Sequence, residues 1–317
     1  MAESVGITQS TSANGQSNPV ETPPIAGVLE RHRGEKHAII LQDYPDPDAI
    51  ASAWAHRLLS QRFGIECTIL YGGKISHQQN RALVRLLNIQ LQRYGEGVDL
   101  AQFDGSVFID NQGTTTLLLE LLRQAGVPPL IIVDHHELQN VIEPEFADIR
   151  RVGATVTIYV NYIRDGLLQL STDHTEHVRL ATALMHGLLT ETGDFVRARA
   201  EEFEAAAYLS RFHDAALLEQ ITNQSRSHVV MEVIQRALQH RELRRNFSIS
   251  GIGYLRAGDR DAIPQAADFL LTEENVHTAI VYGLVVADDG EESVVGSLRT
   301  VKVTIDPDEL LKSTFGR

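Results

Sequence analysis

Cysteine is almost absent from the sequence, which has Cys67 alone among its 317 residues. A single cysteine excludes an intramolecular disulfide and a zinc site built from several thiolates. No run approaches the roughly 18 consecutive apolar residues of a membrane-spanning helix, and the N-terminus lacks the apolar core of a signal peptide. These absences favour a cytoplasmic protein with no membrane partner.

Basic residues are also in short supply, since 28 Lys and Arg face 42 Asp and Glu and give a formal net charge of −14. A protein that holds long nucleic acid by charge needs a basic surface, so this balance argues against long duplex nucleic acid as a partner. Hydrophobic residues make up 43% of the chain and charged residues 22%, which is enough to build packed cores. The length predicts about two domains.

The first half of the chain is predicted to contain a tail and a parallel α/β domain. Residues 1–30 begin with a Ser/Thr/Gln/Asn/Pro-rich stretch that lacks apolar periodicity, which predicts a disordered tail. Residues 31–200 alternate short β-branched runs with longer amphipathic segments, which predicts βαβ units and a mostly parallel, buried sheet. The strands are expected at 37–42, 66–71, 106–110 and 130–134, and the helices between them at about 48–63, 76–94 and 114–125.

The second half is predicted to contain a helical segment followed by a second domain. Residues 201–245 have the pattern of a helical connector. From residue 246 to 317 β-rich segments return around an amphipathic stretch near 261–271, which predicts a second, smaller α/β domain.

Acidic residues gather where three of the predicted strands end. They are joined there by two histidines, and the set is Asp46, Asp48, Asp110, Asp134, His135 and His136. The carboxyl ends of parallel strands share one edge of a sheet, so these side chains are expected to converge. Carboxylates about 4 Å apart would repel one another by several kcal/mol. Since carboxylates with an imidazole suit Mn²⁺ or Mg²⁺, the pattern predicts a site for one or two such ions.

Each acid also has a simpler interpretation. Asp46 or Asp48 taken alone would most often be a turn or N-cap residue, and Asp110 could cap the helix at 114–125. The Asp-His-His tripeptide at 134–136 is harder to explain in this way, because three polar groups at a buried strand end need partners. Taken together, the residues favour the metal site.

Four short motifs resemble those of the DHH phosphoesterase superfamily. PDPDAIASA at 45–53, FID at 108–110 and VDHHE at 133–137 resemble its motifs I, II and III in the right order, and SLR at 297–299 resembles an element of its DHHA1 domain. The resemblance implies a DHH domain with a DHHA1-like companion. The most similar branch includes oligoribonucleases that also act on 3′-phosphoadenosine-5′-phosphate, together with dinucleotide phosphodiesterases. Those enzymes use two metal ions, commonly Mn²⁺.

The resemblance also implies the ligands of both ions. Asp46 would bind one ion and Asp48 the other, Asp110 would bridge the two, and His135 would complete the second site.

The two remaining residues of motif III would have supporting and catalytic roles. Asp134 would orient His135 by accepting its other ring proton. His136 would face the substrate phosphate and help to neutralise charge on the phosphoryl oxygens or the leaving group.

The sequence departs from the family pattern in motifs I and IV. Gln42 stands where a histidine usually begins motif I, and its amide oxygen would be a weaker ligand than imidazole. In the fourth motif Glu191 stands where the family has aspartate, so Glu191 is expected to be a ligand and Asp194 the next candidate.

Other residues are assigned to substrate or to the surface. Arg299 of the SLR element is expected to clamp a terminal phosphate, with a solvated strand arginine as the alternative. Ser52 could bind phosphate near the start of its helix or equally serve in helix packing. Arg197 and Arg199 could approach substrate between the two domains or form surface pairs with Glu201 and Glu202, and the surface pairs are the favoured interpretation.

The end of the chain departs from the family as well. The family has a Gly-Gly-His stretch shortly after SLR, and the chain stops at 315–317, where that stretch is expected, so we expect the sequence to be truncated there.

These features predict a metal-dependent phosphohydrolase that cleaves short oligonucleotides, dinucleotides or 3′-phosphoadenosine-5′-phosphate by metal-activated water. The alternative is a nucleotide-binding regulatory protein whose metal site is degenerate because of Gln42 and Glu191. Inorganic pyrophosphatase is a third class, and the SLR element argues against it. A homodimer is compatible with the sequence.

Overall fold

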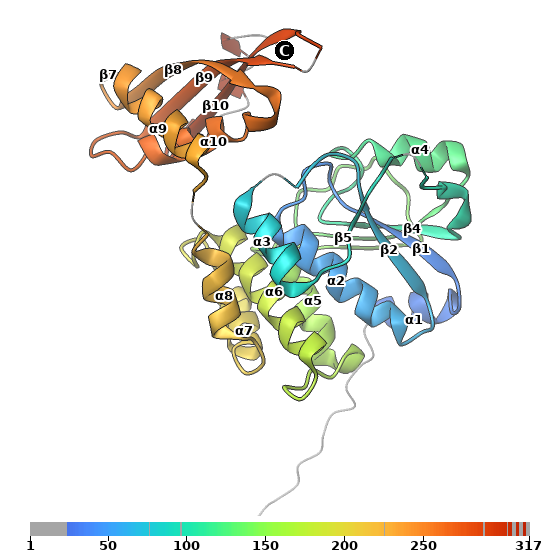
Figure 1. The fold of residues 1–317 in the computed structure, drawn as a ribbon. Coiled ribbons are helices and arrows are strands. Elements are labelled where there is room, and N and C mark those ends of the chain that lie inside the picture. The colour runs from blue at the N-terminus through green and yellow to red at the C-terminus, as the bar shows by residue number, and fades with distance from the viewer. Residues whose placement is uncertain are drawn as a thin grey trace, which may run out of the picture. The chain divides into compact units, whose positions relative to one another are not determined.

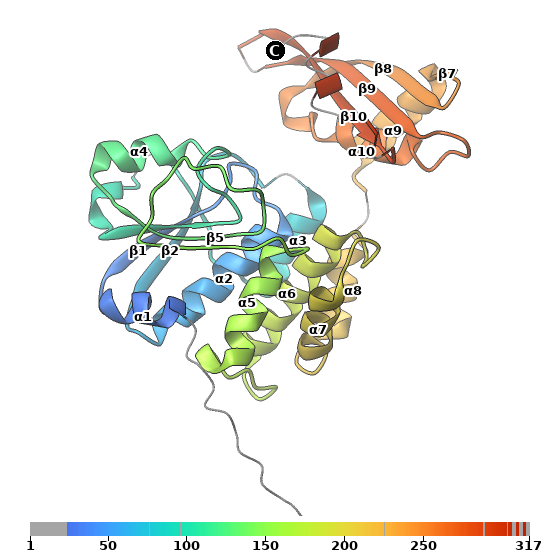
Figure 2. The same ribbon diagram turned by 180° about the vertical axis from the view of Figure 1, so that it is seen from behind.

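The computed structural model describes residues 24–75, 77–95, 97–224, 226–287, 289–302, 304–305, 309–310 and 313–314. The chain forms two compact units that divide between Ile221 and Thr222, and residues 77–82 group with the second unit (Figures 1 and 2).

A six-stranded parallel sheet forms the centre of the first unit, with the strand order β3-β2-β1-β4-β5-β6. The mostly parallel α/β fold that the sequence predicts is therefore confirmed. The strands are β1 (Lys36–Ile40), β2 (Glu66–Tyr71), β3 (Gln92–Arg93), β4 (Gly105–Ile109), β5 (Pro129–Asp134) and β6 (Phe146–Ile149).

Helices cover both faces of this sheet, and the alternation of strand residues explains the arrangement (Figure 1). Along β1, Ile39 points into one core and Ala38 and Ile40 into the other, as the two-residue period of a strand requires. The core around Ala38 and Ile40 contains α4 (Leu118–Ala125), and the larger core around Ile39 contains residues of the other helices. Those helices are α1 (Pro24–Arg31), α2 (Pro47–Gln61), α3 (Gln78–Leu87), α5 (Thr155–Tyr162), α6 (Thr175–Thr192), α7 (Ala200–Leu209) and α8 (Ala215–Thr222).

The second unit has a four-stranded mixed sheet in the order β10-β9-β8-β7. Strands β8 and β9 pair in parallel, whereas the two outer pairs are antiparallel. Apolar residues of the helices and of the sheet share one core. The elements are α9 (His228–His240), β7 (Glu242–Arg244), β8 (Phe247–Arg256), α10 (Ala262–Leu270), β9 (Thr278–Val286) and β10 (Glu292–Thr300).

The structure differs from the sequence prediction at the tail. Helix α1 begins at Pro24, inside the range 1–30 that was expected to be disordered, because Ile25, Val28 and Leu29 recur at helical spacing and are buried. Residues 1–23 and 315–317 lie outside the described residues.

Two further boundaries differ. Helix α3 ends at Leu87, well before residue 94, because Asn88 adopts a left-handed conformation with φ 55° and the short strand β3 follows. The stretch 201–245 is not a separate connector, since Ala205 and Ile221 are buried in the first core and Val233 in the second. Among the described helices, none is both long and apolar enough to cross a membrane.

Candidate metal centre

Adjacent strands bring the predicted acids together at the carboxyl edge of the six-stranded sheet. Strands β1 and β4 are neighbours at its centre, and the chain leaves them in opposite directions across the sheet. In open α/β sheets such a switch point is where ligands bind. The side chains that meet there are Asp46, Asp48, Asp110, His135 and Glu191, and we call them the acidic cluster.

His135 occupies the middle of the acidic cluster. Its Nδ1 lies 3.2 Å from the carbonyl oxygen of Val152, so Nδ1 carries the proton and Nε2 presents a lone pair. Nε2 is buried and has no hydrogen-bond partner among the described residues. Its distances to the nearest oxygens of three carboxylates are 3.5 Å to Asp110, 3.8 Å to Asp48 and 3.9 Å to Glu191.

Asp48 is held by the first turn of α5. Its two oxygens accept hydrogen bonds from the backbone N–H groups of Thr155 and Val156, both at 2.7 Å, and the Ser52 hydroxyl lies 3.4 Å from it. Burial, with the nearby charge of Asp46, raises the pKa of Asp48 well above its usual value. Asp48 is thus fixed in position by neutral donors, which do not cancel its charge.

Asp110 is presented by a left-handed turn at the end of β4, with φ 58°. Asp is one of the few residues that tolerate this conformation. Its side chain accepts the Thr155 hydroxyl at 2.8 Å. Burial and the charges of Asp48 and Asp46 raise the pKa of Asp110 well above its usual value.

Asp46 caps helix α2, as the simpler interpretation proposed, and also faces the cluster. One oxygen accepts the N–H of Ala49 at 2.9 Å and the other accepts the Gln42 amide nitrogen at 2.9 Å. The same nitrogen lies 3.4 Å from Asp110. Gln42 therefore points a donor at these acids, and not the amide oxygen that was expected to be a weak ligand, because carboxylate oxygens accept hydrogen bonds and repel another acceptor.

Asp134 supports His136, which corrects the expectation that it orients His135. The Asp134 carboxylate lies 2.8 Å from His136 Nδ1 and accepts the Gln112 amide at 2.7 Å. Burial alone would raise the pKa of Asp134, but these hydrogen bonds outweigh it and lower the pKa. The bond to Asp134 raises the pKa of His136, whose side chain is 51% exposed. The chain bends directly after β5, and the backbone N–H of His136 also donates to Asp134 at 3.2 Å, so the bend brings His136 rather than His135 onto this carboxylate.

The fourth motif places Glu191 in the cluster and Asp194 outside it. Glu191 lies in the last turn of α6, where burial and the charge of Asp46 raise its pKa. Asp194 is exposed, and among the described residues no hydrogen bond or ion pair joins its side chain to the cluster. The turn has three successive left-handed residues, Gly193, Asp194 and Phe195, with φ between 53° and 66°. Such strain, of order 1–3 kcal/mol per non-glycine residue, gathers at functional sites.

The segment 152–155 organises the cluster, and no sequence motif pointed to it. Val152 orients His135, and Thr155 binds both Asp48 and Asp110. Glu202 anchors this segment by accepting the Gly153 N–H at 2.8 Å. A Cβ at Gly153 would lie 2.7 Å from the Glu202 carboxyl carbon, so a larger residue here would have to displace the Glu202 side chain.

Glu202 is therefore not a surface partner of arginine, as was expected. Its side chain is fully buried, and it accepts the backbone N–H of Arg199 at 2.8 Å and the Thr157 hydroxyl at 3.3 Å. The Arg197 side chain donates instead to the carbonyl oxygen of Glu191. An Arg-to-Glu spacing of three residues suits a helix start as well as a surface pair, so the spacing alone did not distinguish them.

The structure bears differently on the two residues that were expected to bind substrate phosphate. Ser52 is fully buried and its hydroxyl faces Asp48, so the structure corrects the expectation that it binds phosphate. Arg299 is about half exposed on β10, and its Nε donates to Asp268 at 2.8 Å within the second unit. The phosphate-binding role of Arg299 stays a prediction.

The residues of the acidic cluster fit a divalent cation. An imidazole lone pair without a hydrogen-bond partner among the described residues faces three carboxylates, two of which burial and mutual repulsion make costly to ionise. A cation among these atoms would bind the lone pair and offset the repulsion. Oxygen ligands with one imidazole are typical of Mn²⁺ and Mg²⁺ sites.

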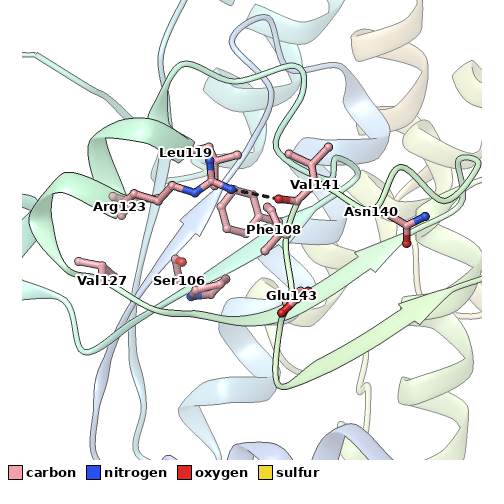
Figure 3. Close-up of a pocket in the computed structure, with 11 residues that line it drawn as sticks. Ser106, Phe108, Leu119, Arg123, Val127, Asn140, Val141 and Glu143 are labelled. Carbon is pink, nitrogen blue, oxygen red and sulfur yellow. Dashed lines mark hydrogen bonds between the residues drawn. The ribbon is translucent and has the colours of Figure 1, made fainter.

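A pocket of about 330 Å³ lies elsewhere in the first unit, between α4 and the segment 140–143 (Figure 3). Arg123 donates from Nη2 to the carbonyl oxygen of Val141 at 3.0 Å beside it. Ser106 and Phe108 of β4 contribute to its lining, and none of the lining residues belongs to the acidic cluster. This pocket is therefore separate from the candidate metal centre.

Comparisons with known proteins give one sequence relative and a shared fold. No protein-family model matches the chain. It is 37% identical over 295 residues to an uncharacterized protein of Methanocaldococcus jannaschii, in a match that covers 91% of this chain and 57% of that protein. The chain thus spans little more than half the length of this curated relative.

Solved structures share the architecture at low identity. An exopolyphosphatase-related protein from Bacteroides fragilis is similar with a TM-score of 0.71 and 15% identity over 92% of this chain and 86% of that one. A RecJ from Thermus thermophilus in complex with Mn²⁺ matches with a TM-score of 0.48 and 14% identity over 93% of this chain and 50% of that one. The chain therefore shares the fold of the exopolyphosphatase-related protein, and the order of its motifs at the strand ends agrees with the resemblance to the DHH phosphoesterase superfamily.

Proposed function

We propose that this chain is a metal-dependent phosphohydrolase that cleaves short oligonucleotides, dinucleotides or 3′-phosphoadenosine-5′-phosphate. The observation that carries the proposal is the buried Nε2 of His135, which has no hydrogen-bond partner among the described residues and lies within 3.9 Å of three carboxylates. Asp48, Asp110, His135 and Glu191 would hold Mn²⁺ or Mg²⁺, with Asp46 beside them. The bound metal would supply a Lewis acid and an activated water for attack on phosphorus.

His136 is the residue of the chain best placed to meet the substrate. Its side chain is half exposed beside the cluster, and Nδ1 lies 3.8 Å from Asp110. Asp134 fixes the ring and raises the pKa of His136, so Nδ1–H is directed to Asp134 and Nε2 is left for the substrate. A protonated His136 can donate to a phosphoryl or leaving-group oxygen.

A short anionic substrate suits the charge of the chain. With a net charge of −14, affinity for phosphate must come from bound cations and a few placed side chains. Arg299, half exposed on β10, is our candidate for a terminal phosphate. Inorganic polyphosphate is also a candidate, since a protein that shares the fold is described as exopolyphosphatase-related.

One observation favours the second candidate, a nucleotide-binding regulatory protein. Gln42 satisfies Asp46 with a neutral amide, at the position where the family usually has a metal-binding histidine. If that substitution disables the metal site, the protein would bind nucleotide without turnover.

The test is Mn²⁺-dependent release of mononucleotide from a dinucleotide by the full chain. We expect His135→Ala to abolish release and Glu191→Gln to lower it at least about tenfold, since each loses a cation ligand. His174→Ala and Asp194→Asn are matched controls on exposed side chains and should retain activity. Undiminished turnover in folded His135→Ala would contradict the proposal, and dinucleotide binding without metal or turnover would favour the regulatory protein.

A further inference from the structure

Two histidines and a glutamate meet at the amino-terminal edge of the same sheet. His32 follows α1, His37 is the second residue of β1, and Glu35 lies between them; we call these three the histidine cluster. One oxygen of Glu35, Oε2, lies 2.8 Å from His32 Nδ1 and 3.1 Å from His37 Nε2. One ligand atom from each residue lies within 4.8 Å of the other two.

A second carboxylate orients His32 from the other side of the ring. Glu145 Oε2 lies 2.8 Å from His32 Nε2, and Arg31 Nε donates to the other Glu145 oxygen at 2.9 Å. A carboxylate that accepts one ring N–H fixes the tautomer, so the other ring nitrogen carries a lone pair. Metal-binding histidines are usually held in this way. Here the freed nitrogen would be Nδ1, the atom that faces Glu35.

The protons of the histidine cluster show why a cation would fit there. Without a cation, His32 must be protonated on both nitrogens to bond both carboxylates. Burial alone would lower the pKa of His32, but its bonds to Glu145 and Glu35 outweigh burial and raise it. His37 is fully buried, and burial lowers its pKa, so it is the neutral imidazole that a metal requires. A divalent cation could replace the proton between His32 and Glu35.

We propose that the histidine cluster binds one Zn²⁺ through His32 Nδ1, Glu35 Oε2 and His37 Nε2. Tetrahedral ligands at about 2.0–2.1 Å from zinc lie roughly 3.3 Å from one another. The separations of Glu35 Oε2 from His32 Nδ1 and His37 Nε2, 2.8 and 3.1 Å, need only small adjustments to reach this value, and the three ligand atoms lie within 4.8 Å of one another. Two imidazoles and a carboxylate form a common zinc ligand set, and water would take the fourth position. The site can be reached, since the side chains of His32 and Glu35 are 16% and 33% exposed.

The ligand set distinguishes this site from the acidic cluster. Two nitrogens and one oxygen favour zinc, whereas the acidic cluster offers mainly oxygen. The proposal does not depend on hydrolase activity, because none of the acidic cluster residues takes part in it.

The experiment counts tightly bound Zn²⁺ per full-length chain after chelation, by competition with a chromophoric chelator. We expect Glu35→Gln to bind one Zn²⁺ fewer than the wild type, and Glu30→Gln, which alters an exposed acid of α1, to bind the same number as the wild type. Asp110→Asn should keep the zinc that Glu35→Gln loses, which separates this site from the acidic cluster. Glu145→Gln should keep the zinc with about 10- to 100-fold weaker affinity.

An equal zinc count in wild type and Glu35→Gln would overturn the proposal. If Glu35→Gln fails to fold, the wild type alone decides the question. Zinc should then shift the imidazole ¹⁵N resonances of His32 and His37 in NMR spectra, and zinc that moves only His135 and His136 would overturn the proposal.

Discussion

The two ends of β1 carry clusters of opposite electrostatic character. The strand spans five residues, so about 13 Å separates its end residues at roughly 3.3 Å per residue. At the carboxyl end, Asp48 and Asp110 are held by backbone N–H groups and the Thr155 hydroxyl, which carry no net charge. At the amino end, Glu35 and Glu145 meet groups that can carry positive charge, namely His32 and Arg31.

This contrast shows what hydrogen bonds can and cannot do for a buried acid. Neutral donors position a carboxylate, but burial and the repulsion among Asp46, Asp48 and Asp110 still raise the pKa values of Asp48 and Asp110. At the amino end a proton on His32 already offsets the charge. A metal at the carboxyl end would relieve the repulsion among the carboxylates themselves, whereas a metal at the amino end must displace a proton from an imidazole.

The largest effect is expected for Asp110→Asn, which should remove Mn²⁺-dependent hydrolysis and also stabilise the metal-free chain. The raised pKa of Asp110 means that its ionised form costs folding free energy at neutral pH. In metal-free wild type, this cost grows as the pH rises above the usual value of 3.8 and levels off above the raised pKa. The variant lacks it, so its melting temperature in chelator at pH 7 should be higher.

Thermal melting in chelator and hydrolysis with Mn²⁺ check both halves of this prediction. The asparagine can still accept the Thr155 hydroxyl through its amide oxygen. Glu35→Gln serves as the comparison at the amino end, where removing the acid leaves His32 with one carboxylate fewer and should lower the melting temperature. A metal-free Asp110→Asn chain that melts below the wild type would contradict our account of the carboxyl end.

A smaller effect is expected for Glu202→Gln, which disturbs the carboxyl end without touching a proposed ligand. Glu202 uses one oxygen for Gly153 and the other for the N–H of Arg199. An amide can keep only one of these bonds as an acceptor. The shift of the segment that holds His135 should weaken Mn²⁺ about tenfold.

Calorimetric titration with Mn²⁺ measures this change, and kinetics should show it as a higher Mn²⁺ requirement with an unchanged KM for substrate. Glu201→Gln, which alters an exposed acid on the same helix, should behave like the wild type. Equal Mn²⁺ affinity in Glu202→Gln and wild type would show that metal binding does not depend on the hydrogen bond between Gly153 and Glu202.

The sequence predicted the members of the acidic cluster better than their supports. Asp46, Asp48, Asp110 and His135 could be predicted to meet because parallel strands end at one edge, a property of the fold and not of side-chain detail. The two cores also follow from the alternation of apolar residues along the strands.

The supports could not be predicted, because most of them are backbone groups. The carbonyl oxygen of Val152 orients His135, and any residue type provides such an oxygen. The pairing of Asp134 with His136 depends on the direction of each side chain at the end of β5. Glu202 is one acid among several near the start of α7, and only the packing against Gly153 shows that it is buried.

The smallest effect is expected at His56, a buried histidine of α2 that belongs to neither of the clusters at the ends of β1. Its protonation adds a pH dependence of stability to that of the two clusters. Its Nδ1 lies 3.0 Å from the Tyr159 hydroxyl, and burial lowers the pKa of His56 to about 3. Because the folded pKa lies below the unfolded value of 6.5, stability is full above pH 6.5 and falls as the pH drops toward 3. The loss should reach about 1.4 kcal/mol at pH 5.5.

Denaturant unfolding in chelator should show this fall in the free energy of unfolding with pH in the wild type and in His174→Ala. His56→Gln should be less stable at pH 7 and should lack this pH dependence. An unchanged slope in His56→Gln would mean that the acid sensitivity belongs to the clusters at the ends of β1.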